Sequence, residues 1–341
     1  MGRFRTTHWL LPILLGFTCL ASLAYEPVQR SLIYLHWVKW PLPPFARFDV
    51  PEHYGFAPQK VKNLYLDTHD GATIGAWLVL AEGAYRDAVD RDDDERAVAN
   101  GGHLDDTVFA AALRNPRYPT VLYFHGNAGT RAVGNRVRIA QKVSALDRNF
   151  LIIDYRGFAD SSSSPPPSEE GVLIDARRAF DYLHVDHDVD PSQIAIMGQS
   201  LGTGIATALA ARLEAQEKKI RALILIAPFS SISTLVETYK LGNVIPLVAP
   251  FKRFPWFFGR LLSLLRTKFD TNSIIRSVSC PILLVHARDD PVIPSSHSRT
   301  LSDTLACSAK VEERAVARWG VVKTFERGLG RGRVVWAESE T

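Results

Sequence analysis

Residues 194–202 have the sequence Ile-Ala-Ile-Met-Gly-Gln-Ser-Leu-Gly, and this stretch decides the fold. Four apolar residues predict a short buried strand, and the pattern of Leu201–Gln216 predicts a helix directly after the turn. Glycines on both sides of Ser200 leave room for a sharp, strained strand-to-helix turn. The start of the helix favours negative charge on the Ser200 oxygen, so the stretch predicts a nucleophilic serine rather than a chance match in a turn.

The same alternation of strand and helix extends over most of the chain. Short, continuously apolar strands between amphipathic helices predict an α/β fold, with a mostly parallel sheet covered by helices on both faces. Asp70-Gly71 between two apolar runs predicts an antiparallel hairpin at one edge. The predicted strands are Val61–Asp67, Thr73–Leu80, Thr120–Phe124, Phe150–Asp154, Ile194–Met197, Ala222–Ile226 and Ile282–Val285, and the predicted helices are Gly134–Leu146, Glu169–Leu183, Leu201–Gln216 and Ser296–Leu305.

A glycine-rich motif follows the strand predicted at Thr120–Phe124. Residues 125–129 read His-Gly-Asn-Ala-Gly, at the sheet edge where such folds bind ligands. We expect the backbone amides of Asn127 and Leu201 to form an oxyanion hole. His125 precedes the oxyanion position and is expected to brace the loop, not to act as a base. The alternative is an ordinary glycine-rich turn.

An acidic motif follows the strand predicted at Ile282–Val285. Residues 285–294 read Val-His-Ala-Arg-Asp-Asp-Pro-Val-Ile-Pro. An acid at this point would orient a catalytic imidazole and stabilise its charged form. Asp290 is preferred to Asp289 because the Pro-Val-Ile-Pro run follows it, and a helix N-cap or turn aspartate is the alternative.

Composition excludes several function classes. The chain has 341 residues, 46% of them hydrophobic, which suffices for a full core. The net charge of +4 is small and dispersed, so nucleic acid is not an expected partner. Three widely separated cysteines form neither a disulfide framework nor a metal knuckle, and Cys280 is expected in the core. The oligomeric state stays open.

Residues 1–45 are interpreted as a membrane anchor or a signal segment. Arg3 and Arg5 precede an apolar run from Trp9 to Ala24, which is short for a span of about 20 residues. The stretch Leu32–Phe45 has the aromatic and basic character of a membrane interface. A retained single-pass anchor in an endomembrane is preferred, and secretion after signal cleavage is the alternative.

Residues 46–341 are expected to form one catalytic domain with two interruptions. Residues 81–117 are charged and predict a solvated surface insertion. Residues 230–278 are too long for one crossover helix and carry interleaved apolar and basic residues. A lid over the site and extra helices packed on the sheet explain this segment equally well.

The motifs HGNAG, DYRG, GQSLG, APF and HARDDPVIP occur in this order. Together they resemble the membrane-anchored monoacylglycerol and lysophospholipid lipases of the α/β-hydrolase family, over roughly residues 61–305. The resemblance implies hydrolysis of carboxylic esters of single-chain lipids without a metal or organic cofactor, with Ser200 as nucleophile and Asp290 as orienting acid. The segment Phe158-Ala159-Asp160 departs from the family pattern and is interpreted as a surface-loop difference.

The family's catalytic histidine is expected after one more strand beyond the aspartate. Arg333–Trp336 resembles that strand, and Thr341 is the last residue. The one histidine after Asp290 is His297, which is expected as a polar residue at an exposed helix start and less as a substitute base. We therefore expect the final histidine loop and helix to be missing, which would expose apolar surface on one sheet face.

Three functions follow from these expectations. A serine hydrolase of lipid esters, with an incomplete gene model, is preferred. A pseudoenzyme that binds acyl ligands without turnover is the alternative. A serine peptidase of the same fold is the third, although the sequence shows no selectivity element for peptides.

Overall fold

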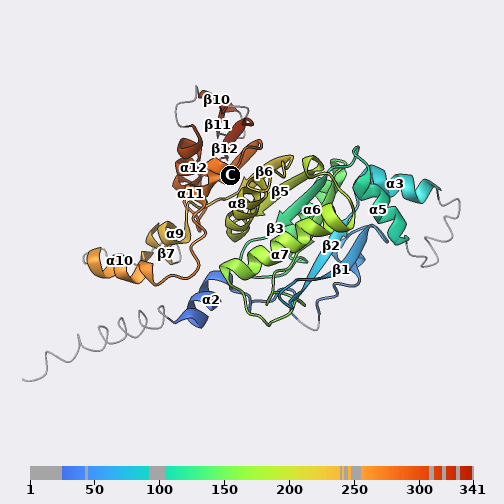
Figure 1. Ribbon diagram of the computed structural model, residues 1–341, viewed down its shortest axis with the longest axis horizontal. Helices are drawn as coiled ribbons and strands as arrows, with labels where there is room; N and C mark the ends of the chain where they lie inside the picture. Colours follow the sequence, from blue (N-terminus) through green and yellow to red (C-terminus); the bar gives the residue numbers. More distant parts are fainter. Residues whose placement is uncertain are drawn as a thin grey trace, which may run out of the picture.

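The computed structural model describes residues 25–42, 45–91, 104–238, 240–241, 245–246, 255–306, 311–316, 320–327 and 331–339. Within these residues, the centre is a ten-stranded sheet of order β1-β2-β4-β3-β5-β6-β9-β12-β11-β10 (Figure 1). The six strands from β4 to β12 run parallel, and antiparallel hairpins complete both edges. The strands are β1 (Val61–Asp67), β2 (Thr73–Val79), β3 (Thr120–Phe124), β4 (Asn149–Ile153), β5 (Ile194–Gln199), β6 (Ala222–Ile226), β9 (Ile282–Ala287), β10 (Glu312–Val316), β11 (Gly320–Phe325) and β12 (Val334–Ser339).

Helices connect the parallel strands and flank the sheet. The order of β3 and β4 is exchanged in the sheet relative to the chain, so that β3 lies beside β5. This exchange brings the residues after β3 next to those after β5. The helices are α2 (Glu26–Tyr34), α3 (Glu82–Arg91), α5 (Asp106–Arg114), α6 (Gly134–Ala145), α7 (Glu169–Asp181), α8 (Leu201–Glu214), α9 (Ile232–Thr238), α10 (Pro255–Ser263), α11 (Thr271–Ile274) and α12 (Ser296–Ala306), and a separate two-stranded sheet joins β7 (Lys240–Leu241) to β8 (Ile245–Pro246).

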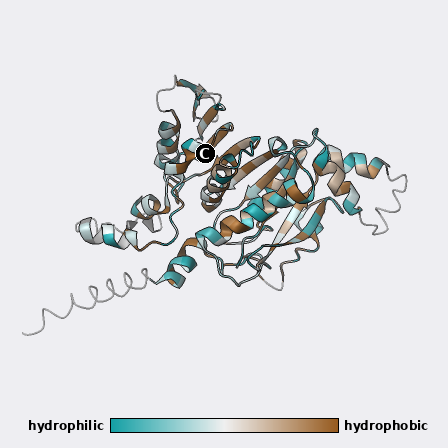
Figure 2. Ribbon diagram, in the orientation of Figure 1, coloured by the Kyte–Doolittle hydropathy of each residue, from teal (hydrophilic) through white to brown (hydrophobic). Residues whose placement is uncertain are grey.

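The core has one cluster on each face of the sheet. Helices α7, α8 and α12 contribute to the larger cluster, and α6 covers the opposite face with Val137 and Ala140. The strands β3 and β4 are buried throughout because both of their faces are covered. Figure 2 shows apolar residues running along the central strands. The predicted α/β fold with helices on both faces is confirmed.

On the sheet face that α6 covers, the side chains of β6, β9 and β12 are only partly buried. Burial alternates along β6, β9 and β12, and the apolar side chains among the buried ones belong to the larger cluster. The intervening side chains on the α6 face are partly exposed. They are Ile224, Ile226, Leu283, Val285 and Val335. These apolar side chains are therefore only partly shielded from solvent by the described residues.

Agreement with the predicted elements is close in the parallel region. The predicted strand at Arg333–Trp336 corresponds to β12, which pairs in parallel with β9. The hairpin of β10 and β11 at the second edge was not predicted. Residues 81–117 contain α3 and α5, and α5 buries Phe109 and Leu113 in the core. This segment is therefore more than a solvated loop, although residues 92–103 lie outside the described part.

Helix α2 contacts the segment between β6 and β9, because Gln29 Nε2 donates to the Leu264 carbonyl at 2.9 Å. Helix α2 precedes β1, and α9, α10 and α11 occupy residues 230–278 between β6 and β9.

In the described ranges, no helix has the length and apolarity needed to cross a membrane. The apolar run Trp9–Ala24, where the sequence predicts an anchor, lies outside those ranges. Cys280 is buried, as expected.

Candidate active site

Ser200 occupies a strained turn between β5 and α8. Its φ of 51° and ψ of −121° lie in a region that residues other than glycine rarely adopt. The Ser200 amide donates to the Ile226 carbonyl at 3.0 Å, which ties the turn to the neighbouring strand. The side chain is partly exposed at the carboxyl edge of the sheet. Strain of this kind marks positions where a side chain is held for chemistry.

Both flanking glycines are required by close backbone packing. A Cβ atom on Gly198 would lie 2.3 Å from the Gly202 carbonyl oxygen. A Cβ atom on Gly202 would lie 2.0 Å from the carbonyl oxygen of Phe124, the last residue of β3. The start of α8 therefore presses directly on the end of β3, and this contact fixes where Ser200 stands.

The loop after β3 lies against the serine. A Cβ atom on Gly126 would be 3.2 Å from the Ser200 Cβ and 3.8 Å from its Oγ. The two motifs that the sequence predicts at separate strand ends are thus in contact. The Tyr155 hydroxyl donates to the His125 carbonyl at 2.8 Å and holds the start of the loop.

A buried arginine sets the orientation of the loop peptides. The Arg136 guanidinium donates to the carbonyls of Gly126, Asn127, Ala128 and Thr130, at distances from 2.6 to 3.3 Å. Because the carbonyls turn toward Arg136, the amides of the same peptides turn away from it. Arg136 is not among the residues predicted from the sequence. Its signal was a cation among apolar residues on the buried face of a predicted helix.

Two backbone amides near Ser200 have no acceptor among the described residues. The amides of Ala128 and Gly129 donate to Tyr34 and Val38 carbonyls. For the Asn127 amide, the described residues provide no acceptor. The Leu201 amide is in the first turn of α8, where no carbonyl of the same helix can accept it. These are the two amides that the sequence predicts as oxyanion donors.

Asp290 follows β9 in a compact turn. Its Oδ1 accepts the amides of Val292 and Ile293 at 2.8 and 2.9 Å. Its Oδ2 lies 3.6 Å from His286 Nε2, and that nitrogen also lies 2.8 Å from the Ile293 carbonyl. Burial acts to raise the pKa of Asp290, but the neighbouring imidazole and the two amides hold that pKa below its usual value. The carboxylate is therefore ionised at neutral pH.

His125 is fully buried inside a polar network. Its Nδ1 lies 2.6 Å from the Gly126 carbonyl, and its Nε2 lies 3.2 Å from Asp154 Oδ1. Burial, together with the positive charge of Arg136, lowers the pKa of His125 and keeps the ring neutral. The ring packs on Tyr155 with centroids 4.5 Å apart. These contacts agree with a bracing role for His125.

Arg131 joins this network to the segment after β4. It is buried and donates to Asp154 at 2.7 Å and to Asp160 at 2.6 Å. Phe158 is fully buried. The interpretation of Phe158-Ala159-Asp160 as a surface-loop difference is therefore wrong, because this segment closes the polar network beneath the oxyanion loop.

His297 is buried, which corrects the expectation of an exposed helix start. Its Nδ1 accepts the Ser230 amide at 3.3 Å and lies 2.9 Å from the Ser230 hydroxyl. The ring hydrogen is thereby assigned to Nε2, which donates to Thr238 Oγ1 at 2.9 Å. Desolvation, with a contribution from His286, lowers the pKa of His297 to about 4. With both nitrogens engaged, His297 joins α12 to α9 and is not free to accept a proton from Ser200.

No described side chain forms a hydrogen bond with Ser200 Oγ. Ser200, the amides of Asn127 and Leu201, and Asp290, which the sequence predicts as catalytic groups, all lie in the described residues, and no described contact places an imidazole between Ser200 and Asp290.

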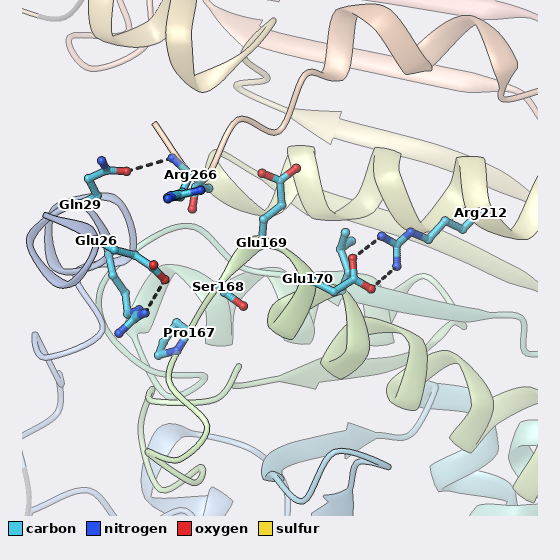
Figure 3. A pocket seen from close by; sticks show the side chains of 11 residues that line it. Glu26, Gln29, Pro167, Ser168, Glu169, Glu170, Arg212 and Arg266 are labelled. Atoms are coloured by element: carbon cyan, nitrogen blue, oxygen red, sulfur yellow. Dashed lines mark hydrogen bonds and ion pairs between the residues drawn. The ribbon is translucent and has the colours of Figure 1, made fainter. Parts of the chain in front are cut away.

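A cavity of about 320 Å³ lies apart from this site (Figure 3). Helix α2, the start of α7 and the segment after α10 line it, and its arginines largely pair with its glutamates, as in Glu26–Arg30 and Glu170–Arg212. It contains none of the residues of the serine turn, the oxyanion loop or the acidic turn. The cavity therefore does not hold the reacting ester.

Comparisons with known proteins agree with this geometry. A family model described as alpha/beta hydrolase fold matches residues 119–264. The lysophosphatidylserine lipase ABHD12 of Gallus gallus is 31% identical over 312 residues, covering 92% of this chain and 75% of that protein. The Danio rerio protein of the same name is 31% identical over 314 residues, with the same coverage of 92% and 75%.

A solved structure supports the fold independently. An alpha-beta hydrolase from Vibrio vulnificus superposes with a TM-score of 0.51 at 18% identity, covering 77% of this chain and 82% of that chain. Fold, strained serine and relatives lead to one assignment: this chain belongs to the α/β-hydrolase family, in the group of the ABHD12 proteins, and by that membership to the serine ester hydrolases.

Proposed function

We propose that this protein hydrolyses the carboxylic ester of a lysophospholipid or monoacylglycerol, with Ser200 as the nucleophile. The observation that carries the proposal is the strained Ser200 turn, packed against a loop whose Asn127 amide has no described acceptor. Relatives named lysophosphatidylserine lipases support a single-chain phospholipid as substrate.

The proposed reaction proceeds in two steps. Ser200 Oγ attacks the acyl carbon, and the carbonyl oxygen gains charge as the tetrahedral intermediate forms. The amides of Asn127 and Leu201 stabilise that oxyanion, a contribution of typically about 3 kcal/mol for each donor in serine hydrolases. The bond from the acyl carbon to the glycerol oxygen breaks, and the deacylated glycerophospho headgroup, or glycerol in the case of a monoacylglycerol, leaves as the protonated alcohol. Water then releases the fatty acid from Ser200.

Proton transfer in this scheme requires an imidazole that Asp290 orients. Its carboxylate is ionised and still has Oδ2 partly accessible, as an orienting acid must. Without the imidazole, catalysis would fall by several powers of ten to a residual of about 10³–10⁴-fold over water. A lipid-binding protein without turnover is therefore the second candidate, since no described side chain serves Ser200 as a base.

The proposed site of action is a membrane. The apolar run Trp9–Ala24 would act as the anchor, and residues 230–278 as a lid between bilayer and site. Deleting residues 1–45 is expected to release the protein from membranes, and continued sedimentation of that variant with membranes would exclude the anchor.

The Ser200→Ala variant tests the mechanism. We expect it to abolish both hydrolysis of lysophosphatidylserine and covalent labelling by a fluorophosphonate probe. Ser192→Ala is the matched control, because Ser192 is exposed at the other end of β5. Turnover that persists in Ser200→Ala would refute the mechanism, whereas lipid binding without any turnover in the unaltered chain would favour the second candidate.

A further inference from the structure

A short N-terminal segment lies against the oxyanion loop. Residues 34–40, here called the strap, begin at the last residue of α2 and precede β1. The Ala128 amide donates to the Tyr34 carbonyl at 3.0 Å, and the Gly129 amide donates to the Val38 carbonyl at 2.7 Å. The loop that follows β3 is therefore bonded to a part of the chain that is far from it in sequence.

A side-chain hydrogen bond extends this contact by one residue. Thr130 is fully buried, and its hydroxyl donates to the Trp40 carbonyl at 2.8 Å. Ala128 and Gly129, which precede it, have positive φ angles of 58° and 65°. Alanine rarely adopts this conformation, so it persists only where the surroundings hold it. Three successive residues of the loop thus donate to carbonyls of the strap.

Two peptide groups of the loop are held at both ends. In the peptide that joins Asn127 to Ala128, Arg136 binds the carbonyl at 3.3 Å and the strap accepts the amide. In the peptide that joins Ala128 to Gly129, Arg136 binds the carbonyl at 2.6 Å and the strap again accepts the amide. The peptide before them has its carbonyl on Arg136 at 3.2 Å, and its amide, that of Asn127, has no acceptor among the described residues. The strap and Arg136 together therefore fix the direction of the Asn127 amide.

The strap is itself tied to other parts of the fold. Lys39 Nζ donates to the carbonyl of Ala159, in the segment after β4, at 2.7 Å. Gln29 of α2 is 3% exposed, and its Oε1 accepts the Arg266 amide at 3.0 Å (Figure 3). Because these contacts hold the strap independently of the oxyanion loop, the strap can position the loop.

We propose that the strap is a positioning element of the active site, whose three carbonyls orient the loop so that the Asn127 amide stays available to an oxyanion. Lys39 and Thr130 are its positioning residues, because they act through the loop. The effect on rate rests on the proposed hydrolysis, whereas the effect on the loop does not. The strap lies outside residues 119–264, which the family model matches, so the site depends on a segment beyond that region.

Amide hydrogen exchange of residues 126–132 in the full chain tests the strap. Lys39→Met removes the donor to Ala159 and keeps an apolar stem of similar length. We expect the Ala128 and Gly129 amides to exchange roughly five- to tenfold faster, the change that one hydrogen bond of typical strength produces. Lys218→Met is the matched control, because Lys218 is half-buried like Lys39 but lies beyond the far end of α8. It should leave the exchange of both amides unchanged.

Thr130 provides an independent pair of variants. Thr130→Val removes the hydroxyl and nearly keeps the shape of the side chain, so it should accelerate the same two amides. Thr130→Ser retains a hydroxyl and should restore the slow exchange. Equal exchange in the valine and serine variants would overturn the role of the bond to Trp40.

The rate of fluorophosphonate labelling at Ser200 supplies the second readout. We expect Lys39→Met and Thr130→Val to lower it by about tenfold, since a displaced amide stabilises the transition state less well. Faster exchange with unchanged labelling would overturn the proposal, because the Asn127 amide would then not depend on the strap.

Exchange separates this inference from the proposed hydrolysis, because it requires no turnover. Ser200→Ala should exchange like the unaltered chain. Unchanged exchange in both Lys39→Met and Thr130→Val would overturn the strap, even if the protein hydrolyses lipid. Faster exchange in a chain that neither labels nor hydrolyses would uphold the strap as the element that orients the loop, and would refute only the hydrolysis.

Discussion

Replacing Gly202 by alanine should impair the site, because it creates a clash between the start of α8 and the end of β3. The added Cβ would lie 2.0 Å from the Phe124 carbonyl oxygen and 2.8 Å from that of His125, whereas real Cβ contacts are essentially never below 3.0 Å. Both neighbours are backbone atoms of the central strand and its loop, so no flexible side chain can move aside. The start of α8 must separate from β3 by at least an ångström.

Two magnitudes follow from this separation. A misplacement of about 1 Å in a catalytic constellation can cost about 100-fold in rate, and here it moves the Leu201 amide relative to the loop of Asn127. Overpacking a core costs typically about 1–3 kcal/mol, and a rigid backbone contact belongs at the upper end. We therefore expect slower reaction at Ser200 together with a lower unfolding midpoint.

The assay compares the rate of fluorophosphonate labelling at Ser200 with the midpoint of urea unfolding. Gly134→Ala is the matched control, because a Cβ at Gly134 meets nothing within 4 Å at the start of α6. The control should keep the wild-type rate and an equal or slightly higher midpoint. A Gly202→Ala protein that labels within about twofold of wild type would show that the contact of α8 with β3 does not position the amides.

Two further variants test the supporting residues. Since burial lowers the pKa of His297 from 6.5 to about 4, the folded protein favours the neutral ring; its contribution to stability is complete above about pH 6.5 and is lost as the pH falls toward 4. Unfolding free energies measured across that range should fall less steeply for His297→Gln than for wild type, and parallel curves would contradict this. Arg136→Met should leave four loop carbonyls without their donor, lowering stability by about 3 kcal/mol and slowing labelling of Ser200, whereas exposed Arg138→Met should change neither. Equal stability and equal labelling rates in the two arginine variants would show that the Arg136 guanidinium does not hold the loop carbonyls in place.

The parallel core could be predicted from the sequence because its strands are continuously apolar. Strands β1, β3 and β6 have the predicted bounds, and the serine turn lies where the glycine spacing requires. Buried parallel strands and their connecting helices have distinct periods, so local pattern and tertiary burial agree. The contact between Gly126 and Ser200 follows from the exchanged order of β3 and β4.

The missed features depend on tertiary contacts. In β10, the residues from Glu312 to Ala315 are exposed, so this edge strand has no buried periodicity to reveal it. His297 resembles a surface residue until Ser230 and Thr238, from the segment between β6 and β9, cover it. Arg131 and Asp160 are far from each other in sequence, and their pairing appears only once β3 and β4 are adjacent. A polar residue buried by a distant partner leaves no local signal.

The structural costs at the site bear on the choice between hydrolysis and binding alone. A positive φ at a serine costs about 1–3 kcal/mol, and the fold has to offset it elsewhere. Ser200 adopts that conformation while Arg136 turns the loop carbonyls away and leaves the Asn127 amide without a described acceptor. A site that only holds an acyl chain needs none of these features, because apolar contact does not depend on amide direction. Amides without an acceptor stabilise the oxyanion that forms when a nucleophile attacks an acyl carbon. The arrangement around Ser200 therefore favours ester hydrolysis over binding alone.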